Sequence, residues 1–256
     1  MKHIAFLSFG KDSMAQVILL KKHGYPLDEV VYVDIRFNNE ISGEHPKTAA
    51  WIPHAEEILK NKFNITVKHL TADTTFYDYF YKTKKKGPHE GERWGFPFTV
   101  GAWCNSRLKL DVISKYINSL KDDVTQYIGI ARDEWSRMEQ LKAKETPRVK
   151  YRSILFELRV RELDAMDICR EFDLVSPKYD DGAFRGGCWF CVKQSLADIY
   201  QLWRDYPAYF EKLLEMEKDS RCTFNRHYNL PTLKAKFEGG FIPKRREKNA
   251  IQKNVR

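Results

Sequence analysis

The sequence predicts an α/β fold, with a doubly wound, mostly parallel sheet in the first part of the chain and a C-terminal helical, cysteine-bearing region after it. Short apolar runs of strand length alternate with segments of helical periodicity, which is typical of a parallel sheet wrapped by helices. The chain has 256 residues, and 43% of them are hydrophobic. That is enough apolar material for a full core.

The strands and helices are predicted from these periodicities. The predicted strands are Ile4–Leu7, Glu29–Asp34, Ile65–Leu70 and Val124–Ile130, with a further strand-like segment at Arg152–Leu158. The predicted helices are Met14–Leu20, Lys47–Phe63, a helix that ends near Leu120, and Leu163–Phe172. We expect the second helix to be interrupted near Pro53, because proline removes a backbone donor and clashes with the preceding turn.

The hexapeptide SFGKDS, residues 8–13, lies between the first predicted strand and the first predicted helix. A strand, a short polar turn and a helix together direct backbone N–H groups and a helix dipole at an anion. Gly10 permits a tight turn and close approach by a phosphate, and Lys11 adds a positive charge. Ser8 and Ser13 add hydroxyl donors. An ordinary turn containing Gly and Ser is the alternative, but the complete hexapeptide favours a phosphate site.

Charged side chains follow other predicted strands. Asp34 ends the second strand, where ligands of α/β sheets bind, although a turn or capping aspartate is equally consistent with its position. Arg107 and Lys109 begin a predicted helix, and Arg132 and Arg137 follow the fourth strand. Such cations can neutralise a polyphosphate. The alternative is that these side chains only form solvent-exposed ion pairs on the surface.

Five cysteines in a chain predicted to be cytosolic favour metal binding or reactive thiols over disulfides. Gly186-Gly187 precede the Cys188-x-x-Cys191 pair, and such a turn lets two thiolates face one metal. A redox pair is the alternative, although it would normally open a helix after an early strand. Cys169 shares a helical face with Met166, which indicates a core position.

The last third of the sequence predicts helices and a basic tail. Ser195–Lys218 is amphipathic and is broken at Tyr206-Pro207, and Cys222 and His227 lie in the loop that follows. We therefore divide the chain into a nucleotide-binding domain over residues 1–175, a Cys-x-x-Cys and helical region over 176–242, and a basic tail over 243–256.

The net charge of +9 comes from 44 Lys and Arg against 35 Asp and Glu. Part of the surplus lies in a predicted loop, at Lys82 and Lys84–Lys86, and part in the tail after Pro243. A solvated surface is the alternative for each cluster, but together they favour a polyanionic partner such as tRNA or DNA. No apolar run reaches the ~20 residues of a membrane span, and no signal peptide precedes the first strand, so we expect a cytoplasmic protein with no membrane partner.

The hexapeptide resembles the S-G-G-x-D-S loop of the PP-loop ATP pyrophosphatases, with Phe9 where the first glycine usually stands. It is also similar to the S-F-x-x-x-S loop of phosphoadenosine phosphosulfate (PAPS) reductases, which belong to the same superfamily. The resemblance implies the adenine nucleotide alpha hydrolase-like fold, with ATP and Mg²⁺ bound and ATP cleaved between its α- and β-phosphates to adenylate a substrate. The implied nucleotide-binding residues are Ser8, Phe9, Gly10, Lys11, Asp12, Ser13, Asp34, Arg107, Lys109 and Arg132, and the implied catalytic residues are Lys11, Asp12 and Arg137.

Three further blocks resemble PAPS-reductase-like sulfurtransferases, including those of DNA phosphorothioation. Residues 103–109 are similar to W-C-x-x-x-L-K, residues 129–137 loosely to G-x-R-x-D-E-S-x-R, and residues 176–191 to the N-P-x-Y-x-x-G…R-x-G-C-x-x-C block of members with a metal centre. The resemblance implies that Cys104, Cys188 and Cys191 hold a [4Fe–4S] cluster with one open iron, as in some tRNA thiolases of the superfamily. If Cys222 or His227 supplies a fourth ligand, the site becomes a closed cluster or a structural zinc.

Taken together, the residues and the resemblance predict an ATP-dependent adenylating sulfurtransferase that acts on a nucleic acid, with ATP and a sulfur donor protein as further partners. A PAPS or adenosine phosphosulfate reductase is the nearest alternative enzyme. Those enzymes use a cysteine in an E-C-G-x-H motif that the sequence does not contain, and they lack the loop lysine that Lys11 supplies. A non-catalytic nucleic-acid-binding protein is the third class.

Overall fold

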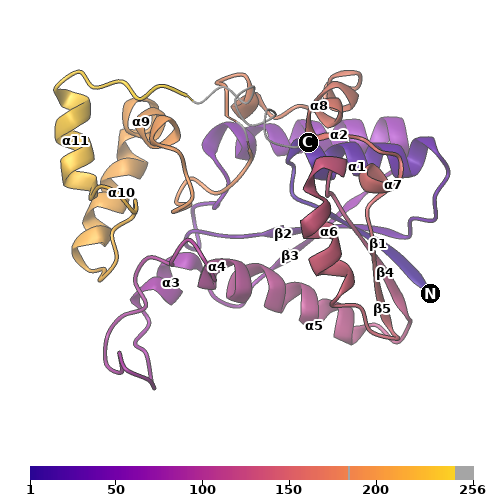
Figure 1. Cartoon of the computed structure of the whole chain (residues 1–256), viewed down its shortest axis with the longest axis horizontal. Helices are drawn as coiled ribbons and strands as arrows, with labels where there is room; N and C mark the ends of the chain where they lie inside the picture. The colour runs from indigo at the N-terminus through magenta and orange to yellow at the C-terminus, as the bar shows by residue number, and fades with distance from the viewer. Residues whose placement is uncertain (184, 246–256) are drawn as a thin grey trace. The chain divides into compact units, whose positions relative to one another are not determined.

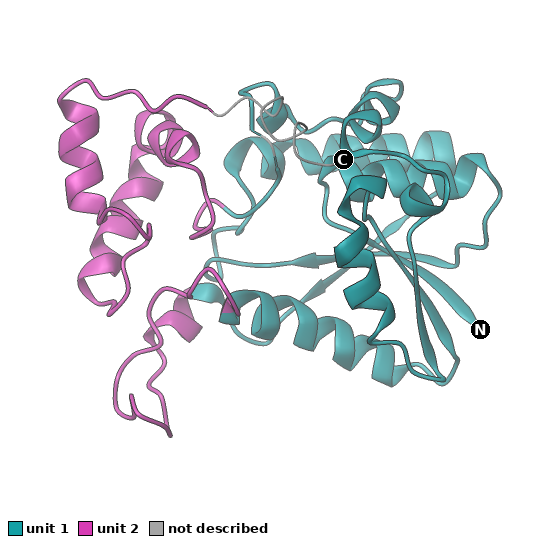
Figure 2. Ribbon diagram, in the orientation of Figure 1, with its two compact units in different colours: residues 1–76, 103–188 teal, residues 77–102, 189–256 magenta. Residues whose placement is uncertain are grey.

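The computed structural model describes residues 1–183 and 185–245, which form two compact units (Figure 1). The first unit contains residues 1–76 and 103–188, and the second contains residues 77–102 and 189–256 (Figure 2). Residues 77–102 fall within the predicted nucleotide-binding domain but belong to the second unit, where Phe96 packs against Phe80 and Phe224. Most of the predicted basic tail, from residue 246 onward, lies outside the described residues.

The first unit is built on a five-stranded parallel sheet, which confirms the predicted α/β fold. The strands are β1 (Lys2–Leu7), β2 (Glu29–Asp34), β3 (Val67–Thr71), β4 (Val124–Ile128) and β5 (Val149–Arg152). Their order in the sheet is β3-β2-β1-β4-β5. The direction of winding reverses between β1 and β4, and in such sheets ligands bind beyond the carboxyl ends of the strands at this switch point.

Helices cover the sheet, which explains why its strands β1 and β2 are largely apolar on both faces. On one face Ala5 and Leu7 belong to a core completed by α1 (Lys11–Lys22), α2 (Pro46–Phe63), α7 (Ile154–Glu157) and α8 (Glu162–Arg170). On the other face Ile4 and Phe6 meet α5 (Asp111–Ser119). The remaining helical elements of the first unit are α4 (Trp103–Asn105), a π-helical turn at Ser106–Leu110, α6 (Trp135–Lys142), and 3-10 turns at Arg132–Glu134 and Pro177–Tyr179.

Two predictions were wrong: the interruption of the second helix near Pro53 and the strand-like segment over Arg152–Leu158. Helix α2 continues through Pro53, because the buried side chains of Trp51 and Ala55 hold both sides of the proline on the core. The strand-like segment predicted over Arg152–Leu158 is the end of β5 followed by α7. Ser153 causes this change, because its side chain accepts a hydrogen bond from the Phe156 amide and caps the new helix.

The second unit contains α9 (Leu196–Asp205), α10 (Pro207–Lys218) and α11 (Leu230–Glu238), and α3 (Phe76–Tyr81) runs into it. The predicted break between α9 and α10 is confirmed at Tyr206. The basic loop forms a short hairpin, in which the Lys84 amide donates to Glu92 O and the Trp94 amide donates to Lys82 O. Throughout residues 1–183 and 185–245, helices fall short of the length and apolar character needed to cross a bilayer.

Candidate functional site

The hexapeptide forms a turn at the carboxyl end of β1 that its own serines hold closed. The Ser8 amide donates to Ser13 Oγ at 3.0 Å, and Ser13 Oγ donates to Gly10 O at 3.0 Å. The two serine hydroxyls lie 3.0 Å apart, and α1 starts at Lys11, directly after Gly10. The turn therefore places two hydroxyls and the amino end of a twelve-residue helix together, an arrangement that binds anions.

Within this turn, Phe9 itself adopts a left-handed backbone conformation, with φ at +51°. Residues other than glycine rarely adopt that conformation, since it crowds the Cβ atom. The Phe9 ring is buried and packs edge-on against Tyr32 and Trp51, at centroid distances of 4.9 and 6.3 Å. Its side chain belongs to the core, and only its backbone belongs to the turn.

Lys11 points into a group of carboxylates rather than into open space. Its Nζ lies 2.6 Å from Asp12 Oδ1 and 3.8 Å from Glu162 Oε2, and the side chain is only 5% exposed. Burial raises the pKa of Asp12, and the charge of Lys11 opposes that rise. The Glu162 amide donates to Asp133 Oδ1, so the turn after β4 holds the start of α8 beside Lys11. An anionic ligand at the turn would compete with these carboxylates for the lysine.

The block at residues 176–187 packs directly against the hexapeptide. The Tyr179 hydroxyl accepts hydrogen bonds from the Lys11 amide at 3.2 Å and the Gly186 amide at 3.1 Å. A Cβ added to Gly186 would lie 3.7 Å from the Gly10 Cα. Burial raises the pKa of Tyr179 to about 12, so its hydroxyl stays protonated at neutral pH. The two sequence blocks that carry the resemblance thus meet at the amino end of α1.

Gly129, which sequence analysis did not single out, follows β4 and touches the same turn. A Cβ at this position would lie 2.7 Å from both the Cα and the N of Ser13, so the backbone could not approach this closely with any other residue. A glycine directly after a buried apolar strand can indicate such an approach. In the sequence, Gly129 stands just before the Asp133-Glu134…Arg137 pattern. Sequence analysis relied on that pattern and did not use the glycine.

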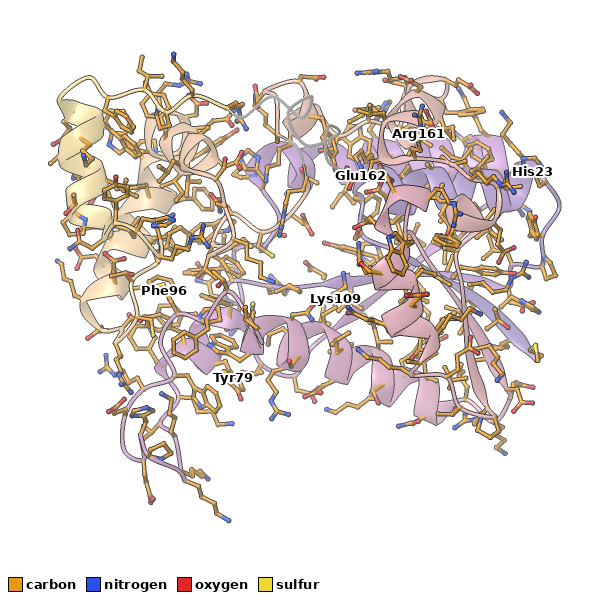
Figure 3. The ribbon with its side chains drawn as sticks, viewed as in Figure 1. His23, Tyr79, Phe96, Lys109, Arg161 and Glu162 are labelled. Carbon is orange, nitrogen blue, oxygen red and sulfur yellow. The ribbon has the colours of Figure 1, made fainter. Side chains whose placement is uncertain are left out.

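A cavity of about 560 Å³ opens beside the turn, between one face of the sheet and helices α5 and α6. Among its lining residues are four predicted site residues, Ser8, Ser13, Lys109 and Arg137. Lys109 lies in the π-helical turn that precedes α5 (Figure 3), and burial lowers its pKa although Glu44 and Cys188 oppose that effect. Cavities of this size bind small organic ligands in other proteins.

The other seven predicted nucleotide ligands do not line this cavity: Phe9, Gly10, Lys11, Asp12, Asp34, Arg107 and Arg132. Arg107 is exposed and pairs with Asp111 at 3.0 Å, and the Arg132 guanidinium lies over the Phe156 ring at 4.6 Å. Asp34 ends β2, and burial raises its pKa. Its Oδ1 is buried and has no hydrogen-bond partner among the described residues. An unsatisfied buried carboxylate oxygen at the carboxyl end of a strand is consistent with a missing ligand.

The candidate cysteines belong to different units. Cys104 and Cys188 lie in the first unit, where the backbone of Cys188 pairs with that of Glu44, and Cys191 and Cys222 lie in the second. Within the described parts of the chain, no group of three or more His, Cys, Asp or Glu side chains could hold a metal ion. The predicted ligand set therefore has members in both units, and Cys169 is a core residue, as predicted.

The comparisons with known proteins give distant similarities only. No known protein family matches the chain. An uncharacterized nin region protein of Escherichia phage lambda is 31% identical over 110 residues, which are 42% of this chain and 34% of that protein. An uncharacterized protein of Methanocaldococcus jannaschii is 24% identical over 216 residues, which are 82% of this chain and 40% of that protein. The chain is thus similar to parts of two proteins and spans less than half the length of each.

Proposed function

We propose that the chain is an ATP pyrophosphatase of the PP-loop class, with the adenine nucleotide alpha hydrolase-like fold, that adenylates a substrate for sulfur transfer to a nucleic acid. One observation carries the proposal. The Ser8–Ser13 turn lies at the switch point of a parallel sheet and opens into a cavity that Lys109 and Arg137 also line. Hydroxyls, a helix amino end and two cations beside one cavity are suited to a polyphosphate.

Each of these residues has a specific task in the proposed reaction. Ser8, Ser13 and the amino end of α1 bind phosphate oxygens, and Asp12 would hold a Mg²⁺ ion, which would supply positive charge to the polyphosphate. Lys11 and Arg137 now pair with carboxylates, and they would exchange these contacts for phosphate oxygens when ATP binds. Lys109 is partly desolvated, which strengthens its attraction for an anion in the cavity.

The proposed chemistry is a displacement at the α-phosphorus of ATP. A substrate oxygen forms a bond to that phosphorus, the bond to the β-phosphate oxygen breaks, and pyrophosphate leaves. A sulfur nucleophile then displaces AMP from the adenylated substrate. Positive charge beside the leaving pyrophosphate favours the first step because it stabilises charge that develops in the transition state. The second step requires a sulfur donor, and a donor protein is the partner we propose.

No step of this proposal passes through a metal cluster, because the described residues contain no group of three or more His, Cys, Asp or Glu side chains that could hold a metal ion. The [4Fe–4S] cluster, with zinc as the alternative, stays a prediction and has its own test. Protein purified without oxygen should be brown if the cluster exists, and Cys188→Ser should lose the colour while it still binds ATP. A colourless wild type with one zinc per chain would contradict the cluster.

The site of ATP cleavage tests the proposed activity. ATP labelled at the α-phosphate should give AMP and pyrophosphate in equal amounts, and a tRNA or DNA acceptor should raise the rate. Release of ADP and phosphate would contradict the proposal. The two alternatives predict other results: a PAPS reductase releases sulfite from PAPS with a thiol reductant, and a non-catalytic nucleic-acid-binding protein cleaves neither nucleotide.

A further inference from the structure

Gln126 contributes a buried carboxamide to the floor of the cavity. It lies in the middle of β4, is 5% exposed, and pairs in register with Ile4 of β1 and Tyr151 of β5. Residues paired in register project from the same face of a sheet, and Gln126 and Tyr151 both line the cavity. A polar side chain in the centre of a buried strand requires a hydrogen-bond partner, because burial removes it from water.

The other two buried glutamines have such partners. Gln16 Oε1 accepts hydrogen bonds from Ser153 Oγ at 3.2 Å and from the Ile154 amide at 3.0 Å. Gln201 Oε1 accepts one from Arg245 at 2.9 Å. The Gln126 carboxamide, in contrast, makes no hydrogen bond to any residue within 1–183 and 185–245, and it borders the cavity. Its partner is therefore water in the cavity or a ligand that displaces this water.

The rest of the cavity fits a flat, largely apolar ring. Apolar side chains from three elements line it, Phe6 of β1, Ile113 of α5 and Leu141 of α6. Gln126 precedes Gly129 by three residues, so about 10 Å of strand separate the carboxamide from the closed serine turn. That spacing leaves room for a sugar between a base at Gln126 and a phosphate at Ser8 and Ser13.

We propose that Gln126 is the specificity-determining residue that selects adenine over guanine at this site. A carboxamide presents one donor and one acceptor side by side. Adenine offers the complementary pair, the N6 donor and the N7 acceptor, whereas guanine offers two acceptors, O6 and N7. With guanine in the same position, the amide oxygen would face another acceptor, and a buried acceptor without a donor is costly. The proposal rests on the proposed function, since it requires a nucleotide with its phosphates at the turn.

The test measures equilibrium binding of ATP and GTP to the full chain, without turnover. The wild type should bind ATP at least about 10-fold more tightly than GTP, which is the discrimination that one bidentate base contact supplies. Gln126→Met keeps the length of the side chain and removes both hydrogen-bonding groups. It should weaken ATP binding by about 10-fold and bring the ATP to GTP ratio close to one. Gln126→Leu also removes both hydrogen-bonding groups and should likewise lose the preference for ATP, and it serves if the methionine variant does not fold.

Thr125→Val is the matched control. Thr125 is also a buried polar residue of β4, but as the neighbour of Gln126 it faces the other side of the sheet. Its substitution should leave the ATP to GTP ratio unchanged. A wild type that binds ATP and GTP equally, or a folded Gln126→Met protein that keeps the preference, would overturn the inference and leave the pyrophosphatase proposal standing. A wild type that binds neither nucleotide would overturn both.

Discussion

Substituting alanine for Gly129 should destabilise the protein and distort the serine turn, although only one methyl group is added. The added Cβ would lie 2.7 Å from Ser13 Cα and N and 2.8 Å from Asp12 C. All three are backbone atoms at the start of α1, so no flexible side chain can move aside. Contacts of this kind ordinarily begin at 3.4 Å, so the end of β4 and the start of α1 must separate by about 0.7 Å.

The size of the effect follows from this displacement. Overpacking by one methyl group in a tightly packed region costs about 1–3 kcal/mol of unfolding free energy. For a protein of this size that corresponds to a decrease in Tm of roughly 2–12 °C. Because the displaced residues form the proposed phosphate site, ATP turnover should fall further, by up to about 100-fold for a misplacement near 1 Å.

Gly10→Ala is the control for stability, since it adds the same methyl group to the same turn. Its Cβ would meet only Tyr179 Oη and Ser8 Oγ, at 3.5 and 3.6 Å, and the φ of −86° suits any residue. Thermal unfolding should therefore show Gly10→Ala to be at least as stable as the wild type and Gly129→Ala to be clearly less stable. A Gly129→Ala protein that unfolds at the wild-type temperature would refute the close approach of β4 to α1.

Three further perturbations test the site, the partner and an ion-pair cluster. Lys11→Ala should weaken ATP binding by at least about 2 kcal/mol in calorimetry, because charge-assisted contacts to phosphate are lost, and unchanged affinity would contradict its assignment. Replacing Lys84–Lys86 with alanine should lower the slope of log affinity for DNA or tRNA against log salt by up to about 3, and an unchanged slope would argue against the hairpin as a contact. Burial raises the pKa of Glu29, but hydrogen bonds from Lys2 and Tyr116 outweigh it and bring the pKa to about 2. Because the pKa is depressed in the folded state, this carboxylate stabilises the protein above pH 4.5 and stops doing so as the pH falls towards 2. Its contribution is at most about 3 kcal/mol, so the difference in denaturant stability between wild type and Glu29→Gln should shrink over that range, and a constant difference would contradict it.

The fold could be predicted where local sequence decides structure. The strands β1 and β2 are largely apolar and buried on both faces, and their pattern identifies a covered parallel sheet before any contact is known. Strand β5 was missed because its sequence, VKYR, is half polar at the edge of the sheet. Its neighbour α7 depends on a single cap at Ser153, and a four-residue helix has no periodicity to detect.

The candidate site was predictable only in part for a similar reason. Ser8 and Ser13 follow from a local motif, and Lys109 and Arg137 were found by motif position. The parts that sequence analysis missed depend on contacts between residues far apart in the chain. Tyr179 reaches the Lys11 amide from 168 positions away, and such a contact leaves no trace in spacing or composition. The cysteine ligand set stays a prediction, because its members belong to two compact units and only the Cys188-x-x-Cys191 pair is local in the sequence.

Phe9 explains how the turn can keep its left-handed conformation without a glycine at this position. A left-handed conformation costs a residue with a Cβ about 1–2 kcal/mol. Full burial of a phenylalanine ring contributes about 1.5–3 kcal/mol, and the Phe9 ring is 2% exposed between Tyr32 and Trp51. The two effects nearly offset each other, so the core fixes the backbone of the turn before any ligand is present. A glycine there would adopt the same φ without strain but would leave the turn free to adopt others. The buried Phe9 ring therefore restricts the backbone of the turn in advance. A restricted turn favours the proposed phosphate binding, because less conformational entropy is lost when the ligand binds.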